Sequence, residues 1–333
     1  MKNHLHVGID VGSTTIKIVI MDDDLNVLHE DYQRHYSDTK NTLCKVLTEF
    51  AEKYKNNTYT ISLTGSGAMS AAKFMEIPFI QEVVACKRAV EKYIPQTDVV
   101  IELGGEDAKI IYFDQSIEQR MNGTCAGGTG AFIDQMASLL NTDASGLNDL
   151  AKNYKIIYPI ASRCGVFAKT DVQPLINEGA NTSDIAASIF QAVVNQTISG
   201  LACGHPIKGH VAFLGGPLTY LSELRNRFIQ TLNLTKDEII VPENAHLLVA
   251  KGAILDSINT KEITHEELLN KIATLKTSKE SNGKSLDALF ENDEDYKEFI
   301  KRHDKNKVPR QSLSEFKGDC FVGIDANQYW LDE

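Results

Sequence analysis

The chain has 333 residues, of which 42% are hydrophobic, enough material for one large domain or two lobes. A formal net charge of −11 argues against a basic surface that binds nucleic acid. Because no stretch approaches the ~18 uninterrupted apolar residues of a membrane helix, we expect a cytoplasmic protein with neither a membrane nor a nucleic-acid partner.

The first third of the chain shows the periodicities of an α/β protein. The pattern predicts strands over residues 5–10, 16–20, 27–36 and 58–67, and helices over 38–55, 70–77 and 83–94. Residues 98–113 then read as a second strand–turn–strand unit. Beyond residue 120 the pattern predicts helices over 129–140, 145–153, 165–178 and 182–201, a strand and helix start over 210–221, and a helix of small residues over 244–255.

Two of these units echo each other. "VGIDVGSTTIKIVI" and "VVIELGGEDAKIIYF" both run from apolar residues through an acid and a glycine turn to Lys-Ile and a second apolar strand. Such an echo favours a duplicated α/β architecture with a site between two lobes, although two unrelated hairpins can share glycines and acids by chance.

The duplication suggests domain boundaries. We expect lobe I over residues 1–92 plus 244–258 and lobe II over 93–243. Residues 259–319 are rich in charge and poor in apolar side chains, as in a linker or peripheral segment. Residues 320–333 contain "FVGIDA", a near copy of the opening "HVGIDV", and are the possible start of a second repeat in a longer protein.

The stretch "GIDVGSTTIK" places the carboxylate of Asp10 at a strand end, ahead of a turn whose amides and hydroxyls can donate to phosphate. Asp10 could hold Mg²⁺ through water. Lys17 either belongs to this site or is a plain exposed strand residue. The Walker A and Rossmann glycine patterns are absent from the sequence. The acidic run Asp22–Asp24 is expected to be a solvated turn.

Glycine turns at residues 12–15, 104–107 and 215–217 each follow a predicted strand, and together they resemble the superfamily of actin, sugar kinases and heat-shock chaperones. The resemblance implies a two-lobed actin-like ATPase fold, made of duplicated ribonuclease-H-like domains with the nucleotide cleft between them. It implies catalytic roles for Asp10, Glu102 and Asp107, with Glu102 standing where many relatives carry aspartate. It also implies a first phosphate loop of Gly12, Ser13, Thr14 and Thr15, a second of Gly104, Gly105 and Asp107, and an adenosine turn of Gly215, Gly216 and Pro217.

Six cysteines stand at positions 44, 86, 125, 164, 203 and 320 without a CxxC pair, and the default for each is a small buried residue. Cys125 and Cys164 differ, because each precedes a glycine and a phenylalanine that starts an apolar helical pattern. A helix N-terminus favours thiolate, which suits an anionic iron–sulfur cluster, a redox-active thiol or a phosphate. The glycines Gly127 and Gly128 could still approach the nucleotide.

A [4Fe–4S] cluster usually takes four thiolates, so two per chain are half a set, which a two-fold dimer or a second repeat would complete. The motifs "NGTCAGGTGAFID" and "SRCGVFAKTDV", with the glycine turns, "FLGGP" and "AKGAIL", resemble the ATP-dependent activators of 2-hydroxyacyl-CoA dehydratases and benzoyl-CoA reductases over residues 5–257.

That resemblance implies that Cys125 and Cys164 of two subunits hold one bridging [4Fe–4S] cluster. It also implies that ATP turnover with Mg²⁺ changes the angle between the helices that start there, and that an electron then passes to a dehydratase or reductase metalloenzyme. The reductant would be a ferredoxin or flavodoxin. Two alternatives stay open: a small-molecule kinase, such as an N-acetylhexosamine kinase, and a non-redox assembly or chaperone module. Cys203 with His205 and His210 is a minor alternative metal site.

Overall fold

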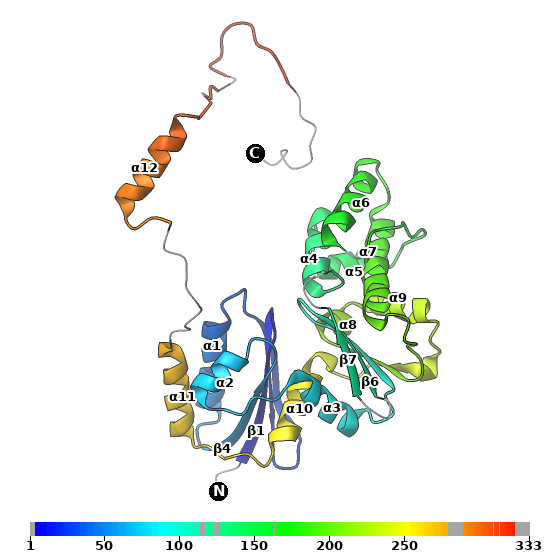
Figure 1. Ribbon diagram of the computed structural model, residues 1–333, viewed down its shortest axis with the longest axis vertical. Helices are drawn as coiled ribbons and strands as arrows, with labels where there is room; N and C mark the ends of the chain where they lie inside the picture. The colour runs from blue at the N-terminus through cyan, green and yellow to red at the C-terminus, as the bar shows by residue number, and fades with distance from the viewer. Residues whose placement is uncertain are drawn as a thin grey trace. The chain divides into compact units, whose positions relative to one another are not determined.

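The computed structural model describes residues 4–113, 117–122, 127–162, 164–278, 289–308, 310–312 and 314–323. Its contacts divide the chain into two units, Met1–Lys279 and Glu280–Glu333. The first unit holds both sheets and all helices except the last, and Figure 1 shows its elements in chain order. The two units are described separately below.

The first sheet has the strand order β3-β2-β1-β4. Its strands are β1 (His4–Val11), β2 (Thr15–Met21), β3 (Val27–Arg34) and β4 (Thr58–Thr64). Strand β1 is antiparallel to β2 and parallel to β4. Because side chains alternate along a strand, its odd positions, from Leu5 to Val11, enter the core under helices α1 (Thr39–Lys53) and α2 (Met69–Met75). The even positions, among them Gly8 and Asp10, face the other side.

The second sheet repeats this arrangement with the order β7-β6-β5-β8-β9. Its strands are β5 (Val99–Leu103), β6 (Ala108–Phe113), β7 (Ile117–Met121), β8 (Val211–Leu214) and β9 (Ile239–Ile240). The first hairpin pairs Asp10 with Lys17, and the second pairs Glu102 with Lys109. The predicted duplication is therefore confirmed down to the register of the acid and the lysine. Strands β7 and β9 were not predicted from the sequence.

Helices cover the second lobe. They are α4 (Gly130–Leu139), α5 (Ala144–Ala151), α6 (Gly165–Asn177), α7 (Thr182–Thr197), α8 (Gly216–Tyr220) and α9 (Ser222–Leu232). A π-helical turn, Ile198–Ala202, extends α7. The segment Thr182–Ala202 is long and apolar enough to cross a membrane, but 67% of its apolar window is buried inside the fold. This burial is typical of the core helix of a globular lobe.

Helices α3 (Glu82–Tyr93) and α10 (Leu248–Ser257) pack on each other next to both sheets (Figure 1). A 3₁₀ turn, Ala245–Leu247, leads into α10. A methyl group on Gly252 would lie 1.8 Å from the carbonyl oxygen of Ala85, and one on Gly8 would lie 2.1 Å from that of Ala250. Only glycine permits these two close approaches, so the small-residue helix predicted here is confirmed as a close-packing element.

The charge-rich segment after residue 259 contains α11 (His265–Thr277) and, in the second unit, α12 (Asp293–Asp304). Helix α11 starts with a capping box of Thr264 and Glu267 and buries Leu268, Ile272 and Leu275 in the core of the first lobe. Helix α12 has no buried residue. Residues 259–278 therefore add packing to lobe I, which their charge pattern alone did not indicate. Residues 324–333, most of the possible second repeat, lie outside the described residues.

Candidate active site

The three predicted glycine turns come together around one cleft of about 650 Å³. Every residue assigned to the turns and to catalysis lines it: Asp10, Gly12, Ser13, Thr14, Thr15, Lys17, Glu102, Gly104, Gly105, Asp107, Gly215, Gly216 and Pro217. Seven further residues line it that the sequence did not single out: Tyr32, Arg34, Ser66, Glu82, Gly130, Ala131 and Asp134. Gly130, Ala131 and Asp134 belong to the quoted motif "NGTCAGGTGAFID", where only the cysteine and two earlier glycines had been singled out. Tyr32, Arg34, Ser66 and Glu82 reach the cleft through packing of the lobes.

The first two turns have the same backbone geometry. The amide of Gly12 donates to the carbonyl of Thr15 at 2.9 Å, and the amide of Gly104 donates to the carbonyl of Asp107 at 2.8 Å. The ring of the buried His35 contacts the carbonyl of Gly12 at 3.1 Å, and the His35 amide donates to the carbonyl of Thr14. Since the amide of Ser37 donates to Nδ1 of His35, the proton resides on Nε2, which donates to Gly12. His35 thus anchors the first turn.

Helix α4 is tied to the second turn. The amide of Gly130 donates to the carbonyl of Gly104 at 3.0 Å, and that of Ala131 donates to the carbonyl of Gly105 at 2.7 Å. These bonds satisfy two of the four amides that a helix start leaves unpaired. They therefore hold the first turn of α4 against the second phosphate turn, and the segment with Cys125 directly precedes that helix start in the sequence.

A buried ion pair forms one side of the cleft floor. Lys17 donates to Oδ2 of Asp10 at 2.7 Å, and both side chains are shielded from solvent. Burial by itself lowers the pKa of Lys17, but the charge of Asp10 and its hydrogen bond outweigh burial and raise that pKa. The alternative of Lys17 as a plain exposed strand residue is therefore wrong. The other oxygen of Asp10, Oδ1, is buried and has no hydrogen-bond partner among the described residues.

The symmetric side of the floor is more acidic. Lys109 lies 2.5 Å from Glu82, 2.7 Å from Asp107 and 4.0 Å from Glu102. Burial raises the pKa of Glu102. Burial, and then repulsion from Glu102, raise the pKa of Glu82 to about 7, against the opposing attraction of Lys109. Helix α3 starts at Glu82, so the helix that packs beside both sheets also delivers a titratable group to the cleft.

The floor fits a hydrated divalent cation. Oδ1 of Asp10 and Oε2 of Glu102 are buried acceptors without hydrogen-bond partners in the described part of the chain. Leaving such groups unsatisfied is costly, and the waters of a bound Mg²⁺ would donate to both. Four carboxylates, those of Asp10, Glu82, Glu102 and Asp107, also exceed the two ammonium groups of Lys17 and Lys109. Both the donor set and the charge therefore suit magnesium.

A second hollow, of about 1040 Å³, adjoins the cleft at the third turn. Its lining is largely apolar and aromatic: Tyr32, Tyr36, Ile133, Ala144, Pro217, Tyr220 and Leu221, with Arg34, Asp134, Asp143 and Ser145. On one side Tyr32, Tyr220 and His246 form an aromatic cluster, in which the Tyr220 hydroxyl lies 3.1 Å from Nε2 of His246. Burial, and then the charge of Lys17, lower the pKa of His246 to about 4.

The predicted thiol site is only partly described. Cys164 is half-buried and is the N-cap residue of α6, so it lies at a helix start as the sequence suggested. Cys125 lies outside the described residues. Gly127 is buried and Gly128 packs near Gln196 of α7, and neither lines the cleft. Gly127 and Gly128 were expected to approach the nucleotide, but it is Gly130 and Ala131 that line the cleft and bond to the second phosphate turn.

The other cysteines divide into two pairs. Cys44 and Cys86 are buried, as predicted. Cys203 and Cys320 are exposed, so the default of a small buried residue is wrong for these two. In the described part of the chain, Cys203, His205 and His210 do not converge as metal ligands, and His210 pairs instead with Asp98.

Two strand–turn–strand lobes with facing phosphate turns and an acidic floor define an actin-like ATPase. The profile of the BadF/BadG/BcrA/BcrD ATPase family matches residues 7–256, and the chain belongs to this family. It is 29% identical over 270 residues to the 2-hydroxyisocaproyl-CoA dehydratase activator of Clostridioides difficile, covering 79% of this chain and 98% of that protein.

Two solved structures share the fold. Component A of the Acidaminococcus fermentans (R)-2-hydroxyglutaryl-CoA dehydratase superposes with a TM-score of 0.66 at 26% identity, over 80% of this chain and 99% of that one. The Clostridium difficile activator of 2-hydroxyisocaproyl-CoA dehydratase with bound ADPNP gives a TM-score of 0.65 at 26% identity, over 84% and 100%. The predicted actin-like ATPase fold and the resemblance to this family are therefore confirmed, and the ADPNP-bound relative supports ATP as the nucleotide.

Proposed function

We propose that the protein is an ATP-hydrolysing iron–sulfur activator that drives low-potential electron transfer to a partner dehydratase or reductase. The carrying observation is the pair of hydrogen bonds from Gly130 and Ala131 to the second phosphate turn. They make the start of α4 respond to whatever occupies the cleft, and the segment with Cys125 leads directly into that start. The dehydratase activators named above are the relatives that this combination fits.

The nucleotide half of the function rests on the cleft floor. Asp10 and Glu102 would hold Mg²⁺ through its waters, and the turns at Gly12–Thr15 and Gly104–Asp107 would bind the phosphates with their amides. Glu82 is the candidate general base, because its pKa near 7 matches the pH at which a base must both exist and accept a proton. The apolar hollow beside Pro217 would take the adenosine.

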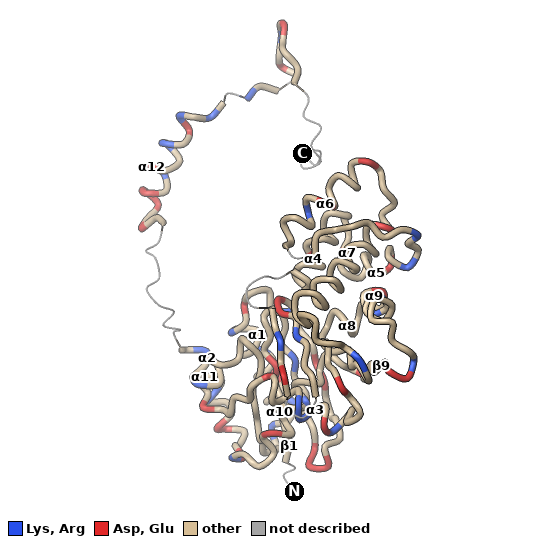
Figure 2. Tube along the Cα trace, turned by 45° about the vertical axis from the view of Figure 1, so that its right-hand side comes forward, with Lys and Arg blue, Asp and Glu red and all other residues tan. Residues whose placement is uncertain are grey.

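The redox half rests on the thiols. Cys125 and Cys164 of each of two copies would supply the four thiolates of one [4Fe–4S] cluster, which when bound supplies a one-electron carrier. Beside Cys164, the side chains of Val166 and Phe167 are 72% and 65% exposed. Figure 2 also shows few charged residues along α4, α6 and α7. An apolar rim around a half-buried thiol is suited to a symmetric interface between two copies.

The two halves can be coupled through helix packing. The start of α6 lies against α4, since a methyl group added at Gly165 would be 3.5 Å from the ring of Phe132. A shift of the second turn would thus pass to α4 and on to Cys164. Reversing a two-state population from 1:99 to 99:1 takes about 5.5 kcal/mol of differential binding, a scale that nucleotide contacts on both lobes can supply. A ferredoxin or flavodoxin would reduce the protein in the cytoplasm.

Anaerobic purification and cluster reconstitution of the full chain test this proposal. We expect a brown dimer with about two iron atoms per chain and a paramagnetic resonance signal after reduction. A colourless monomer that retains both thiols would overturn it. If ADP release were instead stimulated by a sugar, the kinase alternative would replace it.

A further inference from the structure

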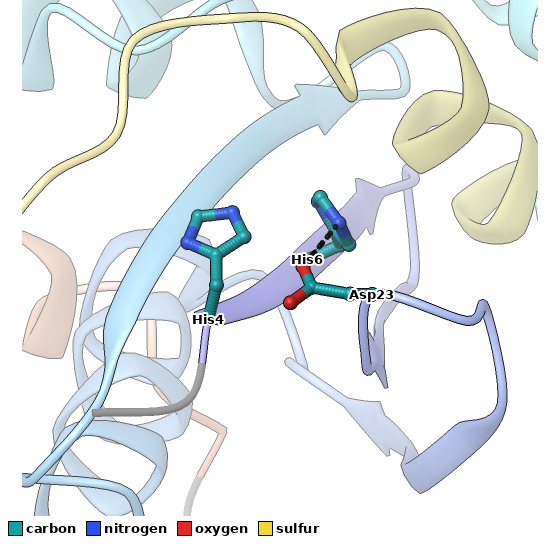
Figure 3. A group of neighbouring side chains, drawn as sticks. All are labelled: His4, His6 and Asp23. Carbon is teal, nitrogen blue, oxygen red and sulfur yellow. Dashed lines mark ion pairs between the residues drawn. The ribbon is translucent and has the colours of Figure 1, made fainter. Parts of the chain in front are cut away.

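The first residues of β1 form a group of potential metal ligands far from the cleft. His4, His6 and Asp23 each offer one ligand atom, and these atoms all lie within 4.8 Å of one another (Figure 3). The two histidines are two residues apart on one strand, so both rings extend from the same face of the sheet. Asp23 reaches them from the turn between β2 and β3. At about 3.3 Å per residue, His6 is about 13 Å and His4 about 20 Å along the strand from Asp10.

The spacing is close to that of a tetrahedral metal centre. Nε2 of His6 lies 3.4 Å from Oδ1 of Asp23. Zinc–nitrogen and zinc–oxygen bonds of about 2.0–2.2 Å place neighbouring ligand atoms about 3.4 Å apart in a tetrahedron. The side chain of Asp23 is 69% exposed and that of His4 is 20% exposed, so both can make the remaining adjustment. Figure 3 shows Asp23 approaching His6 from its own turn, with His4 beside them.

Threonine hydroxyls on the neighbouring strand hold both rings, and they orient His6 as a metal site requires. In the parallel register of β1 and β4, His4 is opposite Thr58 and His6 is opposite Thr60. Nδ1 of His6 is 2.6 Å from the hydroxyl of Thr60, which leaves Nε2 for a metal. Nδ1 of His4 lies 3.2 Å from the hydroxyl of Thr58 and 3.8 Å from a carboxylate oxygen of Glu262. Nε2 of His4 lies 3.3 Å from the hydroxyl of Thr60, a contact that a metal bound at this nitrogen would replace. Such outer partners set the tautomer and direction of ligating histidines.

Charge also favours a cation here. The acidic turn contributes Asp22 and Asp24 beside Asp23, and Asp22 is occupied by its bonds to Asn26. The sequence predicted only a solvated turn at Asp22–Asp24. In the structure this turn presents one carboxylate, that of Asp23, to two histidines.

We propose that His4, His6 and Asp23 form a binding site for a divalent transition cation, best suited to Zn²⁺, with water as the fourth ligand. Two imidazoles and one carboxylate are a ligand set typical of zinc. The ion would join the start of β1 to the β2–β3 turn and so stabilise lobe I. This site is independent of the nucleotide cleft and of the cysteines.

The test compares Zn²⁺ binding to the chelator-treated full chain with binding to three variants. Asp23→Asn removes one ligand, and Asp24→Asn makes the same charge change one residue further on, where the side chain is exposed. His4→Asn removes a second ligand without touching the buried His6. Cysteine sites are the same in all four proteins, so differences between them report only on the proposed site.

We expect the wild type to bind one zinc more than Asp23→Asn and His4→Asn, or to bind that zinc at least tenfold more tightly. Zinc should also raise the melting temperature of the wild type and of Asp24→Asn but not of the other two. When Co²⁺ replaces the one zinc that the wild type binds in excess of these two variants, it should show no thiolate charge-transfer absorption, because the proposed site contains no cysteine. Equal zinc stoichiometry and affinity in all four proteins would overturn the proposal. It would also be overturned if Asp24→Asn lost as much zinc binding as Asp23→Asn.

Discussion

Gly105 of the second phosphate turn lies directly against Thr14 of the first: a methyl group on Gly105 would be 2.2 Å from the Thr14 hydroxyl oxygen. The two lobes therefore meet at their phosphate turns, and a side chain at residue 105 would force them apart. We expect Gly105→Ala to weaken ATP binding at least tenfold, because phosphates that bind both turns need them in contact. Calorimetric titration with ADPNP measures the change. Gly323→Ala, where a methyl group meets nothing within 4 Å, is the control and should bind normally.

The raised pKa of Glu82 predicts a pH dependence. Its carboxylate form predominates above about pH 7, so hydrolysis should rise as the pH increases through that value. Glu82→Gln should slow hydrolysis by about 10²–10⁴-fold and flatten this profile, while ATP affinity changes little. Glu91→Gln, at the far end of the same helix and exposed, should retain the wild-type profile. An unchanged rate in Glu82→Gln would remove Glu82 from the mechanism.

The same group affects stability with a defined sign. The folded pKa of Glu82 exceeds its ordinary value of 4.5, so between about pH 4.5 and 7 the folded protein binds more protons than the unfolded one. The contribution of Glu82 to the free energy of unfolding should therefore fall as the pH rises through this window. Urea titrations at several pH values measure this dependence. From about pH 4.5 to 7 the free energy of unfolding should fall less for Glu82→Gln than for the wild type.

Cys164 offers the most direct test of the redox proposal. Cys164→Ser should abolish cluster binding, because oxygen replaces a thiolate ligand, while ATP affinity stays near that of the wild type. Iron analysis and visible absorption after reconstitution measure the first, and nucleotide titration the second. Cys203→Ser, another accessible cysteine, is the matched control and should keep the cluster. Full iron content in Cys164→Ser would show that our ligand assignment is wrong.

Arg34 of β3 donates to Asp134 of α4 at 3.1 Å, which links the first lobe to the helix that the second turn anchors. Both side chains are about half exposed, so the pair should contribute no more than about 1 kcal/mol. A double-mutant cycle of Arg34→Ala and Asp134→Ala on ADPNP affinity should give a coupling energy of that size. The coupling should shrink as the salt concentration rises. A coupling that is zero at low salt would mean that the pair does not help to hold the cleft closed.

Helix α11 predicts contrasting effects at neighbouring positions. Leu268 is fully buried against the first lobe, whereas the adjacent Leu269 is 38% exposed. Leu268→Ala should lower the free energy of unfolding by about 2–5 kcal/mol, and Leu269→Ala by much less. Urea denaturation of both variants measures the difference. Similar small losses in the two would mean that α11 adds little to lobe I.

Most elements near the site were predictable because their signals are local. Alternating apolar runs such as Leu5–Val11 specify strands wherever the chain folds, and the glycines at residues 104 and 215 mark turns that other residues fit poorly. The echo of Asp10–Lys17 in Glu102–Lys109 likewise needs only the order of side chains along two hairpins. By contrast β9 has two residues, too few for a period to be visible.

The sequence by itself determined the duplicated lobes, the three turns at strand ends and the position of Cys164 at a helix start, because each depends on neighbours within a few residues. Only the tertiary structure decided that Glu82 enters the acidic floor, that Lys17 is buried against Asp10, and that His4 and His6 meet Asp23. These relationships join segments that are distant along the chain or turned toward a common interior. Their energies come from burial and charge, which depend on the packed lobes and not on the order of the residues.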